Sequence, residues 1–236
     1  MAKTKIDLDS VPRHIGIIMD GNRRWAERRG LSATEGHEAG AENLEKIINH
    51  CLDLGVKTLT VYALSTENWR NRTKAEVQGI FGLILKYSKE RKKEYEKKGI
   101  KLGVLGEFQA FPRKVGKAIL EILKIVKSNE RLKVNLALNY GGRDEILNAV
   151  RQIIKEKVPP QKLNEKNFSK FLYTNGEPDP DLIIRTAGEK RLSNFLIWQM
   201  SYSELYFTDT LWPDFSPQEL DKAILDFQRR KRNFGK

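Results

Sequence analysis

Polar and charged side chains follow three of the strands that the sequence predicts, and they are of the types that bind phosphate. A carboxylate, a glycine and two arginines stand in residues 20–25, directly after the first predicted strand. Basic and polar residues also follow the second strand in residues 65–72 and the fifth in residues 185–194. Ligands of open α/β sheets bind outside the carboxyl ends of the strands, so we expect these segments to meet there. Arginines beside a hydroxyl suit a diphosphate.

Asp20 has two interpretations from its position alone. Its carboxylate could cap the helix that begins after Gly21. Alternatively, next to an anion-binding helix start, it would share Mg²⁺ with a bound phosphate, because Mg²⁺ uses one or two carboxylates plus phosphate oxygens. A second carboxylate, Glu204, stands beside the sixth predicted strand. Three basic segments and two acids at one sheet edge favour a phosphate and metal site.

The sequence lacks the motifs of three other common kinds of site, for nucleoside triphosphates, dinucleotides and zinc. It contains no G-x-x-x-x-G-K-[ST] loop, no G-x-G-x-x-G after a strand and no Cys/His spacing for zinc. Nucleotide hydrolysis and dinucleotide redox chemistry are therefore disfavoured. The net charge of +12, from 43 basic and 31 acidic residues, favours an anionic partner. Such a partner is a nucleic acid, an anionic membrane surface or a phosphorylated substrate, and the charge does not choose among them. Alternatively, most of the excess charge lies on solvated helix faces.

The remaining composition is that of an intracellular globular protein. The chain has 236 residues, of which 39% are hydrophobic, enough for a core. No apolar run approaches the ~18 residues of a membrane span, and the first ten residues lack the apolar stretch of a signal peptide. A single cysteine, Cys51, excludes an internal disulfide and fits a reducing cytoplasm.

Short apolar runs alternate with longer stretches of helical periodicity, which predicts one α/β domain over residues 1–236 with an open, mostly parallel six-stranded sheet flanked by helices. The predicted strands are residues 14–19, 57–64, 101–105, 133–139, 182–186 and 205–208. The predicted helices are residues 39–54, 74–98, 112–129, 143–156 and 218–232, with a shorter one over 191–200. The first half of the 74–98 helix is apolar on more than one face. It is therefore either a core helix or a helix that packs one face on the sheet and lines an apolar cavity with another.

Six blocks of the sequence resemble the signature blocks of cis-prenyltransferases, and most closely those of undecaprenyl diphosphate synthases and other polyprenyl diphosphate synthases. These blocks are HIGIIMDGNRRWA, EGHEAG, YALSTENW, NYGGR, RTAGEKRLSNFLIWQMSYSELYFTD and LWPDF, and they stand in family order from about Val11 to Phe215. The resemblance implies a Mg²⁺-dependent cytoplasmic transferase with an apolar tunnel for its growing product, lined by the first half of the 74–98 helix. It would condense isopentenyl diphosphate with an allylic diphosphate such as farnesyl diphosphate, giving a cis-polyprenyl diphosphate like undecaprenyl diphosphate. It further implies a homodimer and no nucleic-acid partner. Because the apolar product must leave into lipid, we also expect transient contact with a membrane surface.

The resemblance also assigns roles to individual residues. It makes Asp20 the essential, catalytic Mg²⁺ ligand, with Glu204 helping to place the metal. The residues that match the allylic diphosphate site are Gly21, Asn22, Arg23 and Arg24, and those that match the isopentenyl diphosphate site are Arg185, Arg191 and Ser193. His37, Ser65 and Asn68 match polar residues around the reacting centre, Asn68 as a catalytic one. Trp25 is counted with the substrate-binding residues, although it, Trp69 and Tyr62 suit packing or the apolar tail better than catalysis.

The sequence departs from the family pattern at several points. Ala33 stands where the family has a phosphate-binding arginine, and Lys190, Arg28 or Arg29 are candidate replacements. The block after Trp69 is one residue longer than W-x-R-P-x-x-E and lacks the proline, so its spacing favours Arg72 over Arg70 as the phosphate contact. DGNRRW replaces the common bacterial DGNGRW, and residues 232–235 approximate the R-x-G tail that reaches a partner subunit.

Three alternatives to the long-chain synthase remain open. The first is a shorter-chain or irregular prenyl diphosphate synthase of the same fold, which Ala33 supports, whereas the small Ala63 favours a long product. The second is a non-catalytic partner subunit, a class that typically loses the catalytic aspartate and the substrate arginines. Asp20, Arg185 and Arg191 are all present here, which disfavours it. The third is a basic nucleic-acid binder, supported by charge alone.

Overall fold

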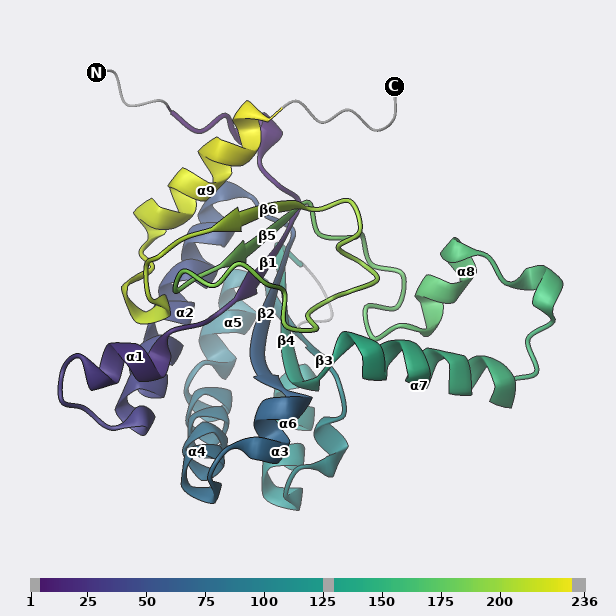
Figure 1. Ribbon diagram of the computed structural model, residues 1–236, viewed down its shortest axis with the longest axis horizontal. Coiled ribbons are helices and arrows are strands. Elements are labelled where there is room, and N and C mark those ends of the chain that lie inside the picture. The colour runs from purple at the N-terminus through teal and green to yellow at the C-terminus, as the bar shows by residue number, and fades with distance from the viewer. Residues whose placement is uncertain (1–4, 125–129, 231–236) are drawn as a thin grey trace.

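The computed structural model describes residues 5–124 and 130–230, and its centre is a six-stranded sheet (Figure 1). The strands are β1 (His14–Ile18), β2 (Thr58–Ser65), β3 (Ile100–Leu105), β4 (Leu132–Tyr140), β5 (Leu182–Arg185) and β6 (Glu204–Phe207). They lie in the order β3-β4-β2-β1-β5-β6, and every neighbouring pair is parallel. The predicted six-stranded sheet is confirmed, with each strand end within one residue of its expected place.

The register of the three central strands places the chemically interesting segments side by side. Ile18, the last residue of β1, is opposite Tyr62 of β2 and Arg185 of β5. The chain segments that leave these three strands therefore leave the same edge of the sheet, as expected for parallel strands.

Helices surround this sheet as the periodicity predicts. They are α1 (Asn22–Glu27), α2 (Ala33–Leu54), α3 (Thr66–Asn71), α4 (Lys74–Glu90), α5 (Lys92–Lys98), α6 (Arg113–Leu123), α7 (Gly142–Lys155), α8 (Glu165–Phe168) and α9 (Pro217–Arg229). One face of the sheet buries an apolar cluster with α2, α5 and α9, whereas Phe195 and Leu196 cover the other face from the β5–β6 connection. In Figure 1, α7 and α8 extend away from the layered body, on the side opposite α1 and α9. No helix in the described ranges is long and apolar enough to cross a bilayer.

Three predicted helices differ from the structure. The helix expected over residues 39–54 begins six residues earlier, at Ala33, where Ser32 and Glu35 form a capping box. The helix expected over residues 74–98 is interrupted at Arg91, which ends α4 and precedes α5, so that α5 packs Tyr95 into the core. The short helix expected over residues 191–200 is wrong, because this segment forms turns. Its residues Ser193, Asn194 and Leu196 have φ angles of 47°, 67° and 42°, which no right-handed helix contains. The predicted ends at residues 129 and 232 lie outside the described residues.

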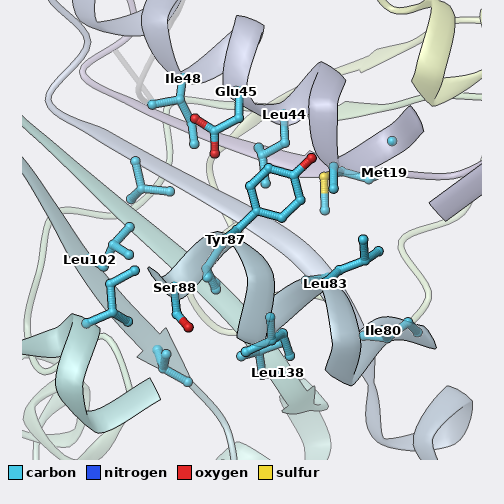
Figure 2. Close-up of a pocket in the computed structure, with 18 of the residues that line it drawn as sticks. Met19, Leu44, Glu45, Ile48, Ile80, Leu83, Tyr87, Ser88, Leu102 and Leu138 are labelled. Carbon is cyan, nitrogen blue, oxygen red and sulfur yellow. The ribbon is translucent and has the colours of Figure 1, made fainter. Parts of the chain in front are cut away.

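Helix α4 has the double role that its sequence predicts. Val77 and Phe81 are buried in an apolar cluster with Phe111. Ile80, Leu83, Ile84 and Tyr87, on another face, line an apolar cavity of about 170 Å³ between α2, α4 and the sheet (Figure 2). Trp69 packs on Phe81 and Phe111, with ring centroids 5.5 and 5.0 Å away, which confirms that it serves packing.

Candidate active site

Asp20 is fixed where β1 ends by hydrogen bonds to its backbone. The Thr186 hydroxyl accepts from the Asp20 N–H at 2.9 Å and donates to the Asp20 carbonyl at 2.7 Å. The Trp212 N–H donates to the same carbonyl at 3.0 Å. Segments after β5 and β6 thus hold the backbone of Asp20, and its carboxylate is positioned without using its own oxygens.

Gly21 makes the turn from β1 into α1. Its φ of +106° lies in the left-handed region, and a Cβ at this position would come within 3.1 Å of the Leu211 and Ala187 atoms. Only glycine fits there without strain. Gly21 is also the N-cap residue of α1, and no side chain caps this helix. The capping interpretation of Asp20 is therefore wrong, and the carboxylate is available for other contacts.

Those contacts include an ion pair with a buried arginine. Arg185 is only 4% exposed, and its Nη2 donates to Asp20 Oδ2 at 2.9 Å. Its Nη1 donates to the Ser193 hydroxyl at 2.7 Å and to the Arg191 carbonyl. One guanidinium thereby connects the carboxylate after β1 with the segment after β5. On the other side of Asp20, Arg24 Nη2 lies 3.6 Å from Oδ1.

Two polar cavities meet at Asp20. The larger, about 570 Å³, contains residues from all three predicted segments, and the smaller, about 290 Å³, lies over the start of α1. Both are lined by Asp20, Asn22, His37 and Arg72; the larger adds Ser65, Asn68, Arg185, Arg191 and Ser193, and the smaller adds Gly21, Arg23 and Arg24.

The apolar cavity adjoins both polar ones. Met19, Asn22 and His37 line all three cavities, and Ala63 lies between the larger polar cavity and the apolar one. The site therefore offers two cationic compartments and one hydrocarbon-lined compartment around a single carboxylate. This arrangement suits two phosphorylated substrates, at least one of which carries an apolar tail.

The residues around Asp20 fit Mg²⁺ only with the help of a phosphate. Within the described ranges, no group of three or more His, Cys, Asp or Glu side chains could hold a metal by itself. Asp20 Oδ2 accepts a hydrogen bond from Arg185, whereas Oδ1 lies too far from Arg24 for one. One carboxylate oxygen with free coordination capacity, beside two anion compartments, is the donor set that Mg²⁺ uses when phosphates supply further ligands.

His37 is a buried neutral imidazole at the junction of the three cavities. Its Nε2 lies 3.1 Å from Arg72 Nη1, and its Nδ1 lies 3.4 Å from the amide nitrogen of Asn22. A guanidinium can only donate, so Nε2 accepts and the neutral ring carries its proton on Nδ1. Burial, followed by the nearby charge of Arg72, lowers the pKa of His37 from 6.5 to about 4.

Two of the predicted site residues lie elsewhere. Glu204 begins β6 opposite Leu182, about 10 Å along the strand direction from the level of Arg185. Its carboxylate accepts a hydrogen bond from Arg230 at 2.7 Å, so within one chain it does not share a metal with Asp20. Trp25 lines none of the three cavities; its indole N–H donates to Asp214 at 2.7 Å.

The candidate replacements for the missing family arginine also lie outside these cavities. Ala33 is the first residue of α2, and neither it nor Arg28 nor Lys190 lines any of the three. Arg29 stacks on the Trp25 ring and pairs with Asp214. Arg72 lines both polar cavities, whereas Arg70 lines none of the three. Residues 232–235 lie outside the described residues.

Sequence reasoning did not place four residues that help to form the site, and of these it had named Tyr62 only for packing or the apolar tail. Tyr62, Glu67 and Asn194 line the larger polar cavity, and Thr186 holds the backbone of Asp20. All four belong to the segments that follow β2 and β5 or to the strand ends, so position was the available signal. Their side-chain types did not distinguish them from ordinary loop residues.

Known proteins resemble this chain over nearly its whole length. The profile of a family described as "Putative undecaprenyl diphosphate synthase" matches residues 18–235. Proteins named isoprenyl transferase from Aquifex aeolicus and Fusobacterium nucleatum are 49% and 50% identical to it over 226 residues, 96% of each chain. The crystal structure of lavandulyl diphosphate synthase from Lavandula x intermedia, in complex with dimethylallyl diphosphate, covers 97% of this chain and 100% of its own, with TM-score 0.91 and 36% identity. A "probable undecaprenyl diphosphate synthase" from Campylobacter jejuni covers 95% of this chain and 99% of its own, with TM-score 0.80 and 35% identity.

The neutral state of His37 predicts a loss of stability in acid. Its pKa is 6.5 when unfolded and about 4 when folded, so between these values the unfolded chain binds the proton first. The stability is complete above pH 6.5 and falls as the pH drops toward 4, by about 3 kcal/mol in all. Urea unfolding between pH 4 and 7.5 measures this fall, and His37→Gln, which still accepts from Arg72, should flatten it. His14, also buried, contributes equally to both proteins. Identical pH profiles for the two would contradict the assignment.

Proposed function

The chain belongs to the undecaprenyl diphosphate synthase family of prenyltransferases, and from this premise we propose that it joins isopentenyl diphosphate to an allylic diphosphate, farnesyl or similar. The observation that carries the proposal is the meeting of two cationic cavities at Asp20, both adjoining an apolar one. The small Ala63, where the polar and apolar cavities adjoin, favours a polyprenyl product of the undecaprenyl type.

In this proposal the two diphosphates occupy the two polar cavities. The allylic diphosphate binds over the start of α1, against the first-turn N–H groups and the guanidinium groups of Arg23, Arg24 and Arg72. Isopentenyl diphosphate binds in the larger cavity beside Arg191 and Ser193, with Arg185 beneath them. The allylic tail then extends past Met19 and His37 into the apolar cavity.

The reaction needs stabilisation of a leaving group more than it needs a strong base. The allylic C1–O bond breaks with its electron pair leaving on the diphosphate, and the isopentenyl double bond supplies the electrons of the new bond to C1. The proton of C2 then goes to a basic oxygen, either of Asp20 or of a diphosphate. Arg23, Arg24 and Arg72 lie where they stabilise the departing negative charge. Mg²⁺ bound by Asp20 and phosphate oxygens would neutralise further negative charge. Holding both diphosphates in one relative pose adds an entropic advantage.

A second candidate function is an irregular or shorter-chain prenyl diphosphate synthase of the same fold. The high structural similarity to lavandulyl diphosphate synthase favours keeping it, as does Ala33 in place of an arginine. A non-catalytic partner subunit is less well supported. Asp20, Arg185, Arg191 and Ser193 line one cavity together, which a subunit without catalysis would not need.

The proposal predicts a Mg²⁺-dependent product ladder. Purified protein would be incubated with labelled isopentenyl diphosphate and, separately, dimethylallyl, geranyl, farnesyl or geranylgeranyl diphosphate, and the products sized by chromatography. Asp20→Asn should lower kcat by at least about 10²-fold, because it removes the anionic oxygen that would hold Mg²⁺ beside the diphosphates. Asp53→Asn, an exposed carboxylate on α2, is the matched control and should leave activity unchanged. No product from any primer would reject the synthase and favour the partner subunit.

We also propose a homodimer that uses the free face of α7. Leu147, Val150 and Ile154 follow one another along one side of this helix and are 51%, 39% and 69% exposed. Side chains at i, i+3 and i+7 form one stripe, and an apolar stripe on a helix that extends from the body favours contact with a second chain.

Replacing Ile154 by Asp should therefore weaken association, because a carboxylate would be buried in an apolar interface. Sedimentation velocity over a range of protein concentrations measures the fraction of dimer, and we expect the dissociation constant to rise at least tenfold. Leu120→Asp is the control, since Leu120 on α6 is similarly exposed at 50%. A dimer that survives Ile154→Asp unchanged places the interface elsewhere.

The proposal places the protein in the cytoplasm, with transient contact to an anionic membrane surface and no nucleic-acid partner. Its net charge of +12 attracts anionic headgroups, and a long apolar product leaves into lipid. Flotation with vesicles containing anionic lipid should show binding that weakens as salt is raised. Absence of binding at low salt would remove membrane contact from the proposal.

A further inference from the structure

A carboxyl group lies in the wall of the apolar cavity. Glu45 of α2 stands between Leu44 and Ile48, which also line the cavity, and its side chain is 13% exposed (Figure 2). The buried Tyr95 of α5 donates its hydroxyl proton to Glu45 Oε1. Arg91, at the break between α4 and α5, has its Nε 3.8 Å from Glu45 Oε2. We refer to these three residues as the tunnel cluster.

The tunnel cluster leaves its polar groups incompletely satisfied. Among the described residues, the Glu45 carboxylate accepts one hydrogen bond, and the buried Nε of Arg91 lies near this carboxylate but has no hydrogen-bond partner. Glu145, another buried carboxylate of this protein, receives hydrogen bonds from Tyr140, Tyr173 and Gln199. A buried polar group without its full set of partners costs stability, so its presence calls for an explanation. Burial raises the pKa of Glu45, which agrees with its apolar surroundings.

The position of Glu45 along α2 gives that explanation. His37, where the polar cavities adjoin the apolar one, stands eight residues earlier on the same helix, or about 12 Å at 1.5 Å per residue. An extended isoprene unit contains four chain bonds and is about 5 Å long. A tail that enters past His37 thus reaches Glu45 after roughly two to three units, and further units must pass it.

We propose that Glu45, held by Tyr95 and Arg91, is a polar stop that opposes growth of the prenyl tail beyond its level in the tunnel. This inference rests on the proposed function in its shorter-chain form, because it takes the tail to enter from the Asp20 end and to be opposed about two to three units beyond His37. A wild-type product ladder that extends to undecaprenyl length would overturn it. Units before Glu45 gain free energy by contact with aliphatic side chains such as Leu83 and Leu44. A unit that reaches Glu45 removes the remaining water from a carboxyl that has one hydrogen bond, which costs free energy.

Product length tests the stop directly. Glu45→Leu replaces the carboxyl by an apolar side chain of similar size, so the longest products should gain at least one isoprene unit. Glu45→Gln keeps an acceptor for Tyr95 and should give lengths between the two. Glu42→Leu makes the same change at an exposed position of the same helix and should leave product length unchanged. Thermal unfolding of each variant verifies that it is folded.

Tail binding provides a second measurement that needs no catalysis. Calorimetry would give the affinities of geraniol, farnesol and geranylgeraniol, which contain two, three and four isoprene units. In the wild type the gain in affinity with each unit should stop once the tail meets Glu45. In Glu45→Leu the affinity for geranylgeraniol should rise at least about fivefold, and in Glu42→Leu it should not change.

The two measurements separate the failure of this inference from the failure of the proposed function. If no primer gives product but Glu45→Leu strengthens geranylgeraniol binding, the polar stop stands and the synthase proposal falls. If the wild type forms products and Glu45→Leu alters neither their length nor the alcohol affinities, the polar stop is overturned.

Discussion

The buried guanidinium of Arg185 is the constraint on which the site depends. At 4% exposure, its charge is removed from water and must be compensated by nearby acceptors. Those acceptors are the Asp20 carboxylate, the Ser193 hydroxyl and the Arg191 carbonyl. Because the three acceptors come from segments after two different strands, the pairing fixes those segments relative to each other. The two polar cavities are therefore parts of one electrostatic unit, and Asp20 lines both.

The backbone conformation after β5 follows from the need to place hydrogen-bond acceptors around the buried Arg185 guanidinium. Ser193 and Asn194 have positive φ angles, which non-glycine residues seldom adopt. Phe195, which follows them, is fully buried against the sheet and compensates for that unfavourable conformation by apolar burial. The Ser193 hydroxyl can then meet Arg185 while the neighbouring aromatic ring anchors the turn. Ser193, which contacts Arg185, and Phe195, which is buried against the sheet two residues later, thereby stabilise each other's positions.

This coupling explains which parts of the molecule the sequence could predict. Parallel strands buried on both faces are continuous apolar runs, so all six were found, and parallel order alone brought Asp20, Ser65 and Arg185 to one edge. The periodicity of residues 191–200 suggested a helix because Phe195 and Leu196 are apolar, but the sheet rather than a helix neighbour buries them. Glu204 was misplaced because its sequence neighbourhood does not reveal at which end of β6 it lies. The direct pairing of Asp20 with Arg185 joins residues 165 positions apart and has no local signal.

The apolar cavity lowers the packing stability of the fold, and this loss needs an explanation in the function of the protein. A cavity of about 170 Å³ lined mainly by apolar side chains leaves those side chains without the packing contacts that a filled core would give them. A larger side chain at Ala41 of α2 would fill part of this space, whereas a Cβ at Gly40 would come within 2.4 Å of Asn22 Oδ1. A cavity left open beside two cationic compartments, with a carboxyl in its wall, is what an enzyme needs when its substrate supplies the missing hydrocarbon and that hydrocarbon grows.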